Sequence, residues 1–132
     1  MEKAEFNNLK YRYMQYLTIE KDIHIGSMYY DDLRELTKYE EILSHLDDTM
    51  NPKGNDTGAD NMVKFTKDES AFCQKMKKIA LVDVKKGLDM TFVNNIIDGG
   101  LEMFETACID MMNNIENLSL EDVNKYDNEQ SR

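Results

Sequence analysis

The sequence predicts an all-α protein, a compact bundle of four or five helices. One proline and six glycines in 132 residues leave long stretches without the residues that punctuate turns. An all-β sandwich needs such signals at regular intervals, so that class is disfavoured. Apolar residues also recur at helical spacing in several of these long stretches, as expected of helices with one buried face.

Composition predicts a single helical domain over residues 1–125 that folds without metal or disulfide support. Hydrophobic residues make up 41% of the chain and charged residues 32%, which suits a globular protein with a charged surface. Cys73 and Cys108 fall among apolar residues at helical spacing, which is typical of reduced core cysteines. No run of about 18 apolar residues occurs, and we expect a cytoplasmic protein.

Two helices are expected before residue 51. Residues 4–20 carry Phe6, Leu9, Tyr13, Tyr16 and Leu17 on one helical face. Gly26 should interrupt this helix, and Ser27 should cap a second one that runs from about residue 28 to residue 45 or a little beyond. Arg34, Lys38, Glu41 and His45 should form the polar side of the second helix. Its apolar stripe comprises Tyr29, Leu33, Leu36, Tyr39, Leu43, Leu46 and Met50.

A flexible loop near residues 51–61 should separate these helices from a third. Thr66 and Glu69 match a capping box. Phe72, Cys73, Met76, Ile79 and Ala80 then share a face, and Asp83 should lie beside that face. Residues 79–84 also fit a short strand, but no partner strand is apparent. Gly87 should kink or break the helix, with a short helix over residues 91–97 to follow.

The last long helix has the clearest pattern. Glu102, Asp110, Asn113 and Asn117 should face solvent, and Ser119 should cap a short terminal helix. Residues 126–132 should be a disordered tail. The apolar stripe comprises Leu101, Phe104, Cys108, Met111, Met112, Ile115 and Leu118.

Charge is segregated along the chain. Residues 1–50 contain 11 acidic and 6 basic residues, residues 51–88 contain 5 and 8, and residues 89–132 contain 10 and 2. The basic middle should therefore meet the acidic ends within the fold, or meet an acidic partner. The net charge of −10 argues against direct binding to nucleic acid or to anionic lipid.

Six residues are candidates for a partner-binding surface. Lys75, Lys78, Lys85 and Lys86 fall within roughly 100° on the polar side of the third helix. They are either its solvated side, complementing acidic neighbours, or a contact patch. Tyr11 and Tyr30 lie off the apolar stripes of their helices, and tyrosine is enriched among interface anchors.

Signals for catalysis are poor, and neither a metal site nor a cofactor is predicted. The chain lacks a phosphate loop, a His-Glu-x-x-His motif, a CxxC motif and a nucleophile elbow. Glu20, His24, Glu41 and His45 repeat a metal-like spacing, but the polar setting of His45 and the nearby Gly26 count against a site. The carboxylates Glu102, Glu105 and Asp110 are better explained as a solvated face than as part of a metal-dependent hydrolase.

The sequence therefore favours a non-catalytic protein-interaction module, a small acidic regulator or inhibitor of a larger protein. The alternative is an acidic nucleic-acid mimic that inhibits a DNA- or RNA-handling enzyme. A metal-dependent hydrolase is the least favoured function. Self-association is left open, and no membrane contact is expected. The 13 lysines against 3 arginines are compatible with an AT-rich genome, which includes those of many phages and some large DNA viruses.

Overall fold

The residues that the structure describes form five helices that pack against one another, which confirms the predicted all-α class. A computed structural model describes residues 1–28, 39–50, 63–94 and 100–130, and within them the side chains of residues 1–23, 44–50, 63–86 and 102–129. No strand is present in these residues. The helices are α1 (Lys3–Met28), α2 (Tyr39–Met50), α3 (Lys67–Asn94), α4 (Gly100–Glu116) and α5 (Leu120–Gln130).

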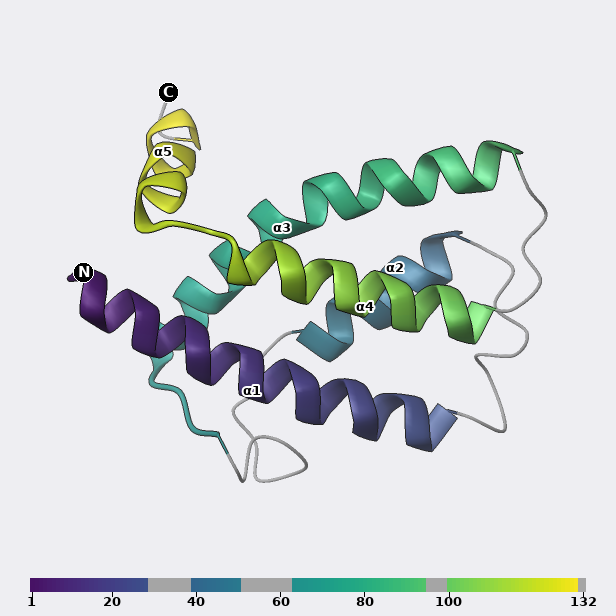
Figure 1. The fold of residues 1–132 in the computed structure, drawn as a ribbon, viewed down its shortest axis with the longest axis horizontal. Coiled ribbons are helices and arrows are strands. Elements are labelled where there is room, and N and C mark those ends of the chain that lie inside the picture. Colours follow the sequence, from purple (N-terminus) through teal and green to yellow (C-terminus); the bar gives the residue numbers. More distant parts are fainter. Residues whose placement is uncertain (29–38, 51–62, 95–99, 131–132) are drawn as a thin grey trace.

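Helix α4 packs against α1, α2 and α3, and α5 packs on α3. Figure 1 shows α1 and α4 running side by side, with α2 behind them, α3 along the opposite side of α4, and α5 standing at the end of the bundle near the N-terminus. Among the described helices, none covers the side of α1 and α4 that faces the viewer in Figure 1.

The core is built from the predicted apolar stripes. All five stripe residues of α1 are buried, and Phe104, Cys108, Met111 and Ile115 of α4 are fully buried beside them. Leu46 and Met50 extend the core through α2. Because the α4 pattern has the regular spacing of a helix with one apolar face, its register could be read directly from the sequence.

The first helix ends differently from the prediction, whereas the second ends a little beyond His45, as predicted. Helix α1 continues through Gly26 and Ser27 to Met28, so Ser27 is not an N-cap. A glycine inside a helix costs only about 1 kcal/mol, which packing of the long helix can offset. The described part of the second helix is Tyr39–Met50, which extends beyond His45. Residues 29–38 and the predicted loop at 51–61 lie outside the described residues.

Helix α3 is also longer than predicted. It runs through residues 79–84, which excludes the strand alternative, and through Gly87 without ending there. Thr91 to Asn94 belong to this same helix, while residues 95–99 lie outside the described residues. Asp83 is exposed and not beside the apolar face, because Val84 takes the buried position next to it.

Two predicted caps are confirmed. The backbone N–H of Glu69 donates to Thr66 Oγ1 over 3.1 Å, and the Glu69 carboxylate accepts from the Thr66 N–H over 2.9 Å. Ser119 and Asp122 form the same reciprocal pair at the start of α5. The prediction of a disordered tail from residue 126 is wrong as far as Gln130, because α5 is fastened to α3 by an ion pair between Asp127 and Lys75.

Side chains of α1 stabilise the ends of two other helices. The buried Tyr13 hydroxyl donates to the carbonyl of Met50, the last residue of α2, over 2.6 Å. The Lys10 ammonium donates to the carbonyls of Glu116 and Leu118 at the end of α4, over 2.8 and 2.9 Å. Carbonyls at a helix C-terminus have no partner within the helix, so these contacts supply the missing donors.

The register of α4 predicts which substitutions destabilise the protein. Phe104→Ala and Ile115→Ala should each lower the free energy of unfolding by about 2–5 kcal/mol, since both side chains are fully buried. Glu102→Ala and Asn113→Ala, on the exposed side, should stay within about 0.5 kcal/mol of the wild type. Urea unfolding followed by circular dichroism measures all four, and equal losses in both pairs would contradict the register.

Two tyrosines of α1 provide a matched test of the α2 cap. Tyr13→Phe leaves the Met50 carbonyl without its buried donor and should lower the free energy of unfolding by about 1–3 kcal/mol. Tyr11→Phe removes an exposed hydroxyl and should change it by less than about 0.5 kcal/mol. The same unfolding measurement compares them, and a neutral Tyr13→Phe would show that the contact contributes nothing.

Candidate functional site

Helix α3 carries six of the 16 Lys and Arg residues of the chain, and two of its lysines are used inside the fold. Lys77 is buried and forms an ion pair with Asp47 of α2. Lys75 is half-buried, and its ammonium lies 2.9 Å from the carboxylate of Asp127 in α5. The basic middle of the chain therefore does meet acidic segments on either side of it, as the charge pattern predicted.

The other predicted lysines form a surface that we call the lysine ridge, which consists of Lys78, Val82, Lys85 and Lys86. All four side chains are exposed, and Val82 at the centre is 50% exposed. At 100° per residue these positions lie opposite the buried Ala80, so the ridge faces away from the core. Within the described residues, no ion pair involves its three lysines. Their charge is thus available to a partner.

Tyr11 is exposed, as predicted, but it lies on a different helix from the lysine ridge. Its side chain is 65% exposed on α1, and its hydroxyl accepts a hydrogen bond from the Gln15 amide over 3.3 Å. Tyr13 and Tyr16 are instead part of the core. Tyr30 lies outside the described residues. The structure therefore does not bring the predicted tyrosines and lysines into one site.

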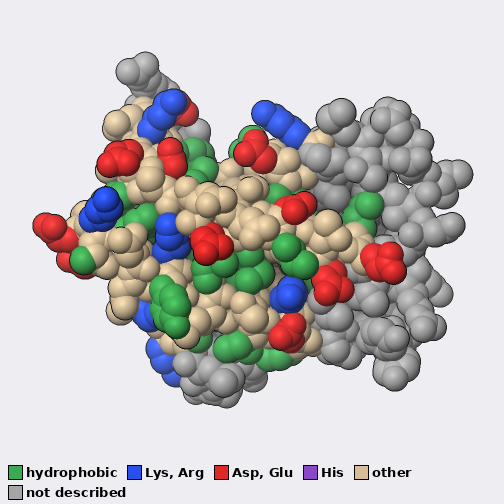
Figure 2. All heavy atoms as spheres, in the orientation of Figure 1, with side chains coloured by type: hydrophobic (Ala, Val, Ile, Leu, Met, Phe, Trp, Pro, Cys, Tyr) green, Lys and Arg blue, Asp and Glu red, His purple; other side chains and the backbone are tan. Residues whose placement is uncertain are grey.

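The exposed side of α4 carries the opposite charge. We call it the acidic face, and it consists of Glu102, Glu105, Ile109, Asp110 and Glu116. The helix has no basic residue, and Ile109 is 43% exposed among the carboxylates. No ion pair within the described residues involves these four acids. Figure 2 shows acidic, basic and apolar side chains together on the side where α1 and α4 run.

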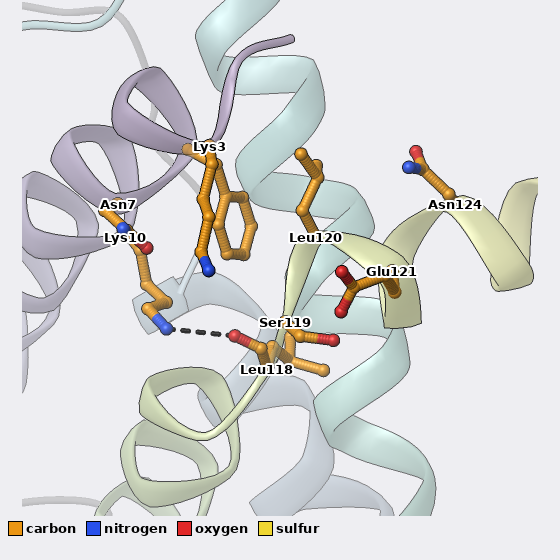
Figure 3. A pocket seen from close by; sticks show the side chains of 9 residues that line it. Lys3, Asn7, Lys10, Leu118, Ser119, Leu120, Glu121 and Asn124 are labelled. Carbon is orange, nitrogen blue, oxygen red and sulfur yellow. Dashed lines mark hydrogen bonds between the residues drawn. The ribbon is translucent and has the colours of Figure 1, made fainter.

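A groove of about 330 Å³ lies between the start of α1 and the turn from α4 to α5. Figure 3 shows Lys3 and Lys10 on its α1 side and Glu121 on its α5 side. The Lys10 ammonium already donates to two carbonyls. At the start of α5, the backbone N–H of Asp122 donates to Ser119 Oγ in the Ser119–Asp122 cap, and the hydrogen bonds of this cap lower the pKa of Asp122. Lys10 and the Ser119 hydroxyl, two of the polar groups that line the groove, are thus already used in hydrogen bonds within the fold.

A second hollow of about 590 Å³ lies on the other side of α1, beside Arg12 and Glu69. The Arg12 guanidinium pairs with the Glu69 carboxylate and donates to the Lys64 carbonyl over 3.0 Å. The hydrogen bond from Arg12 is the main reason that the pKa of Glu69 is lowered, with the Thr66 N–H adding to it. Arg12 and Glu69 thus hold the N-terminus of α3 against α1, so we assign them a structural role.

The two cysteines are poor candidates for nucleophilic chemistry. Both are buried and free, and burial raises the pKa of each thiol to about 12. A cysteine nucleophile must be a thiolate near neutral pH, so these thiols have the wrong protonation state.

The metal-like spacing at Glu20 and His45 does not produce a cluster in the described residues. No group of three or more His, Cys, Asp or Glu side chains there is placed to hold an ion. His45 is half-buried, with its ring 6.4 Å from that of Phe104, so its predicted place on the polar face of α2 is wrong. The side chains of His24 and Glu41 lie outside the described residues.

Sequence reasoning missed the charged residues that hold the helices together: Lys10, Arg12 and Lys77. Lys77 falls roughly 100° from Met76 in the helical projection, close enough to the apolar face to have been singled out. Nothing local distinguishes Lys10 or Arg12, because the groups that they contact outside α1 lie at least 52 residues away in the chain.

Comparison of the chain with protein-family models, curated proteins and solved structures found no match. Among the described helices, none is both long enough and apolar enough to cross a bilayer. Within the described residues, the lysine ridge, the acidic face and the exposed Tyr11 are the surfaces that bear on function.

The state of the two thiols is testable by alkylation. Iodoacetamide at about pH 8 should modify neither Cys73 nor Cys108 in the folded protein, because a buried thiol with a raised pKa forms little thiolate. Both should react within minutes in denaturant. Intact-mass spectrometry counts the additions, and rapid labelling of either residue in the native state would reinstate a reactive cysteine.

Proposed function

We propose that this protein is a non-catalytic interaction module that binds an acidic surface of a larger protein through the lysine ridge of α3. The observation that carries the proposal is the arrangement of the ridge. Three exposed lysines without ion-pair partners among the described residues surround an exposed valine on one regular helix. The ridge spans about 12 Å along α3, from Lys78 to Lys86.

The chemistry of the ridge suits an acidic protein surface. Long lysine side chains supply charge complementarity that steers encounter and fixes orientation, while most of the affinity must come from apolar contact. Val82 supplies a small apolar centre for that contact. Binding of this kind weakens as salt screens the charges, which distinguishes it from a purely apolar interface.

The role of α3 in the fold supports the same proposal. Lys77 is fixed by Asp47 of α2 on the inner side of α3, and Lys75, on the same side as the ridge, is fixed by Asp127 of α5. A partner that binds the ridge therefore meets a surface that is already ordered, which reduces the entropy lost on binding.

The acidic face of α4 favours a second candidate function, that of a nucleic-acid mimic. Four carboxylates on one helix, with no basic residue between them, could occupy the phosphate-binding groove of a DNA- or RNA-handling enzyme. Ile109 interrupts the row of charges, and the lysine ridge lies on the neighbouring helix. The interaction module is therefore the function that the surface supports better.

Retention of partners from a lysate by immobilised protein tests both candidates. Reversal of two ridge charges in Lys78→Glu with Lys85→Glu should abolish the retention of specific proteins, and about 1 M salt should release them from the wild type. A matched control, Lys67→Glu with Lys125→Glu, makes the same change in net charge at exposed positions off the ridge and should retain them. Circular dichroism should show that both variants are folded.

The same experiment separates the two candidates. For a mimic, the ridge reversal should leave retention of a nucleic-acid enzyme intact, and Glu102→Gln, Glu105→Gln and Asp110→Asn together should abolish it. Equal retention by the ridge variant and its control would contradict the proposed use of the ridge.

A further inference from the structure

The lysine ridge and the acidic face cannot neutralise each other within one molecule. Helices α3 and α4 pack together through their inner sides, where the Asn114 amide donates to the Ala80 carbonyl over 3.2 Å. Val82 and Ile109 are exposed on the outer sides of these same helices. The two charged surfaces therefore look away from each other, and each remains open to a second molecule.

The two surfaces are matched in pattern as well as in charge. Each has a half-exposed β-branched aliphatic residue at its centre, Val82 on α3 and Ile109 on α4. Four residues before this centre stands Lys78 on one helix and Glu105 on the other. Further charges follow the centre, Lys85 and Lys86 on α3 and Asp110 and Glu116 on α4. The ridge extends about 12 Å from Lys78 to Lys86, and the acidic face extends about 21 Å from Glu102 to Glu116.

We propose that the protein self-associates head to tail, with the lysine ridge of one copy seated on the acidic face of the next. This inference rests on the proposed function, since it takes the ridge as a surface for an acidic protein, and it names a second copy of the chain as one occupant. The two surfaces are different, so the contact is heterologous, and an open assembly keeps one free ridge and one free acidic face at its two ends unless a ring closes.

The size of the surfaces sets the strength of this association. Exposed ion pairs contribute about 0–1 kcal/mol each, and one ridge on one helix face covers less than the roughly 1,000 Å² of a stable interface. The net charge of −10 also repels two copies, although a Debye length of about 8 Å at 0.15 M salt screens much of this repulsion. The association should therefore be weak, concentration-dependent and lost at high salt.

Sedimentation equilibrium of the purified full chain tests the proposal. The wild type should show a rising average mass between about 10 µM and 1 mM protein in 0.15 M salt, and only monomer in about 1 M salt. Lys78→Glu with Lys85→Glu, and separately Glu105→Lys with Glu116→Lys, should each raise the dissociation constant about tenfold or more. Lys67→Glu with Lys125→Glu is the control and should associate as the wild type does.

Mixing the two reversed variants gives the sharpest outcome. The mixture should associate although neither variant does so alone, because the acidic face of the first still meets the lysine ridge of the second. If the lysine substitutions in α4 unfold the chain, Glu105→Gln with Glu116→Gln carries the same test, with loss of self-association expected.

Three results would overturn the inference: a wild type that is monomeric at every concentration, reversed variants that associate like the wild type, or a mixture that stays monomeric. A monomeric wild type whose ridge variant still loses lysate partners would overturn self-association alone. It would leave the proposed function standing, so the two failures are distinguishable.

Discussion

The fold depends on the way in which α1 completes the other helices. A helix C-terminus leaves carbonyl groups without donors, and burying them unpaired is costly. Tyr13 supplies a donor to the end of α2, and Lys10 supplies one to the end of α4. Arg12 adds an ion pair to Glu69 at the start of α3. One helical turn of α1 thus positions three other helices, and the outer sides of α3 and α4 are presented to solvent as a consequence.

The lysines of α3 have two different roles in the folded protein. Lys77 and Lys75 fasten α3 to the acidic helices α2 and α5, where their partners are Asp47 and Asp127. Burial of Lys77 makes its pairing a requirement of the fold, because an unpaired buried ammonium would be strongly unfavourable. The lysine ridge, which lies opposite Lys77 and further along α3 than Lys75, forms no ion pair within the described residues, which is why we assign the interaction to the ridge.

The ridge and the acidic face together give the protein two surfaces of opposite sign on adjacent helices. Each surface is small, and each has one aliphatic side chain at its centre, Val82 or Ile109. Such surfaces favour weak contacts whose strength depends on salt and on the number of surfaces engaged at once. A regulator that acts by occupying a larger protein could use both, and competition between a second copy and that partner for the ridge would follow from the same geometry.

The sequence by itself determined the helical class, the core stripes and the two capping boxes, because periodicity and capping are local properties of the chain. The stripe of α4 from Phe104 to Ile115 and the cap at Thr66 needed no distant information. Only the tertiary structure decided that α1 passes through Gly26 and that α3 passes through Gly87, since packing can offset the weak helix propensity of glycine. It also decided which lysines form ion pairs inside the fold, because Lys75 and Lys77 find partners 52 and 30 residues away in the chain. Lys78, at the next position in the chain, is exposed to solvent.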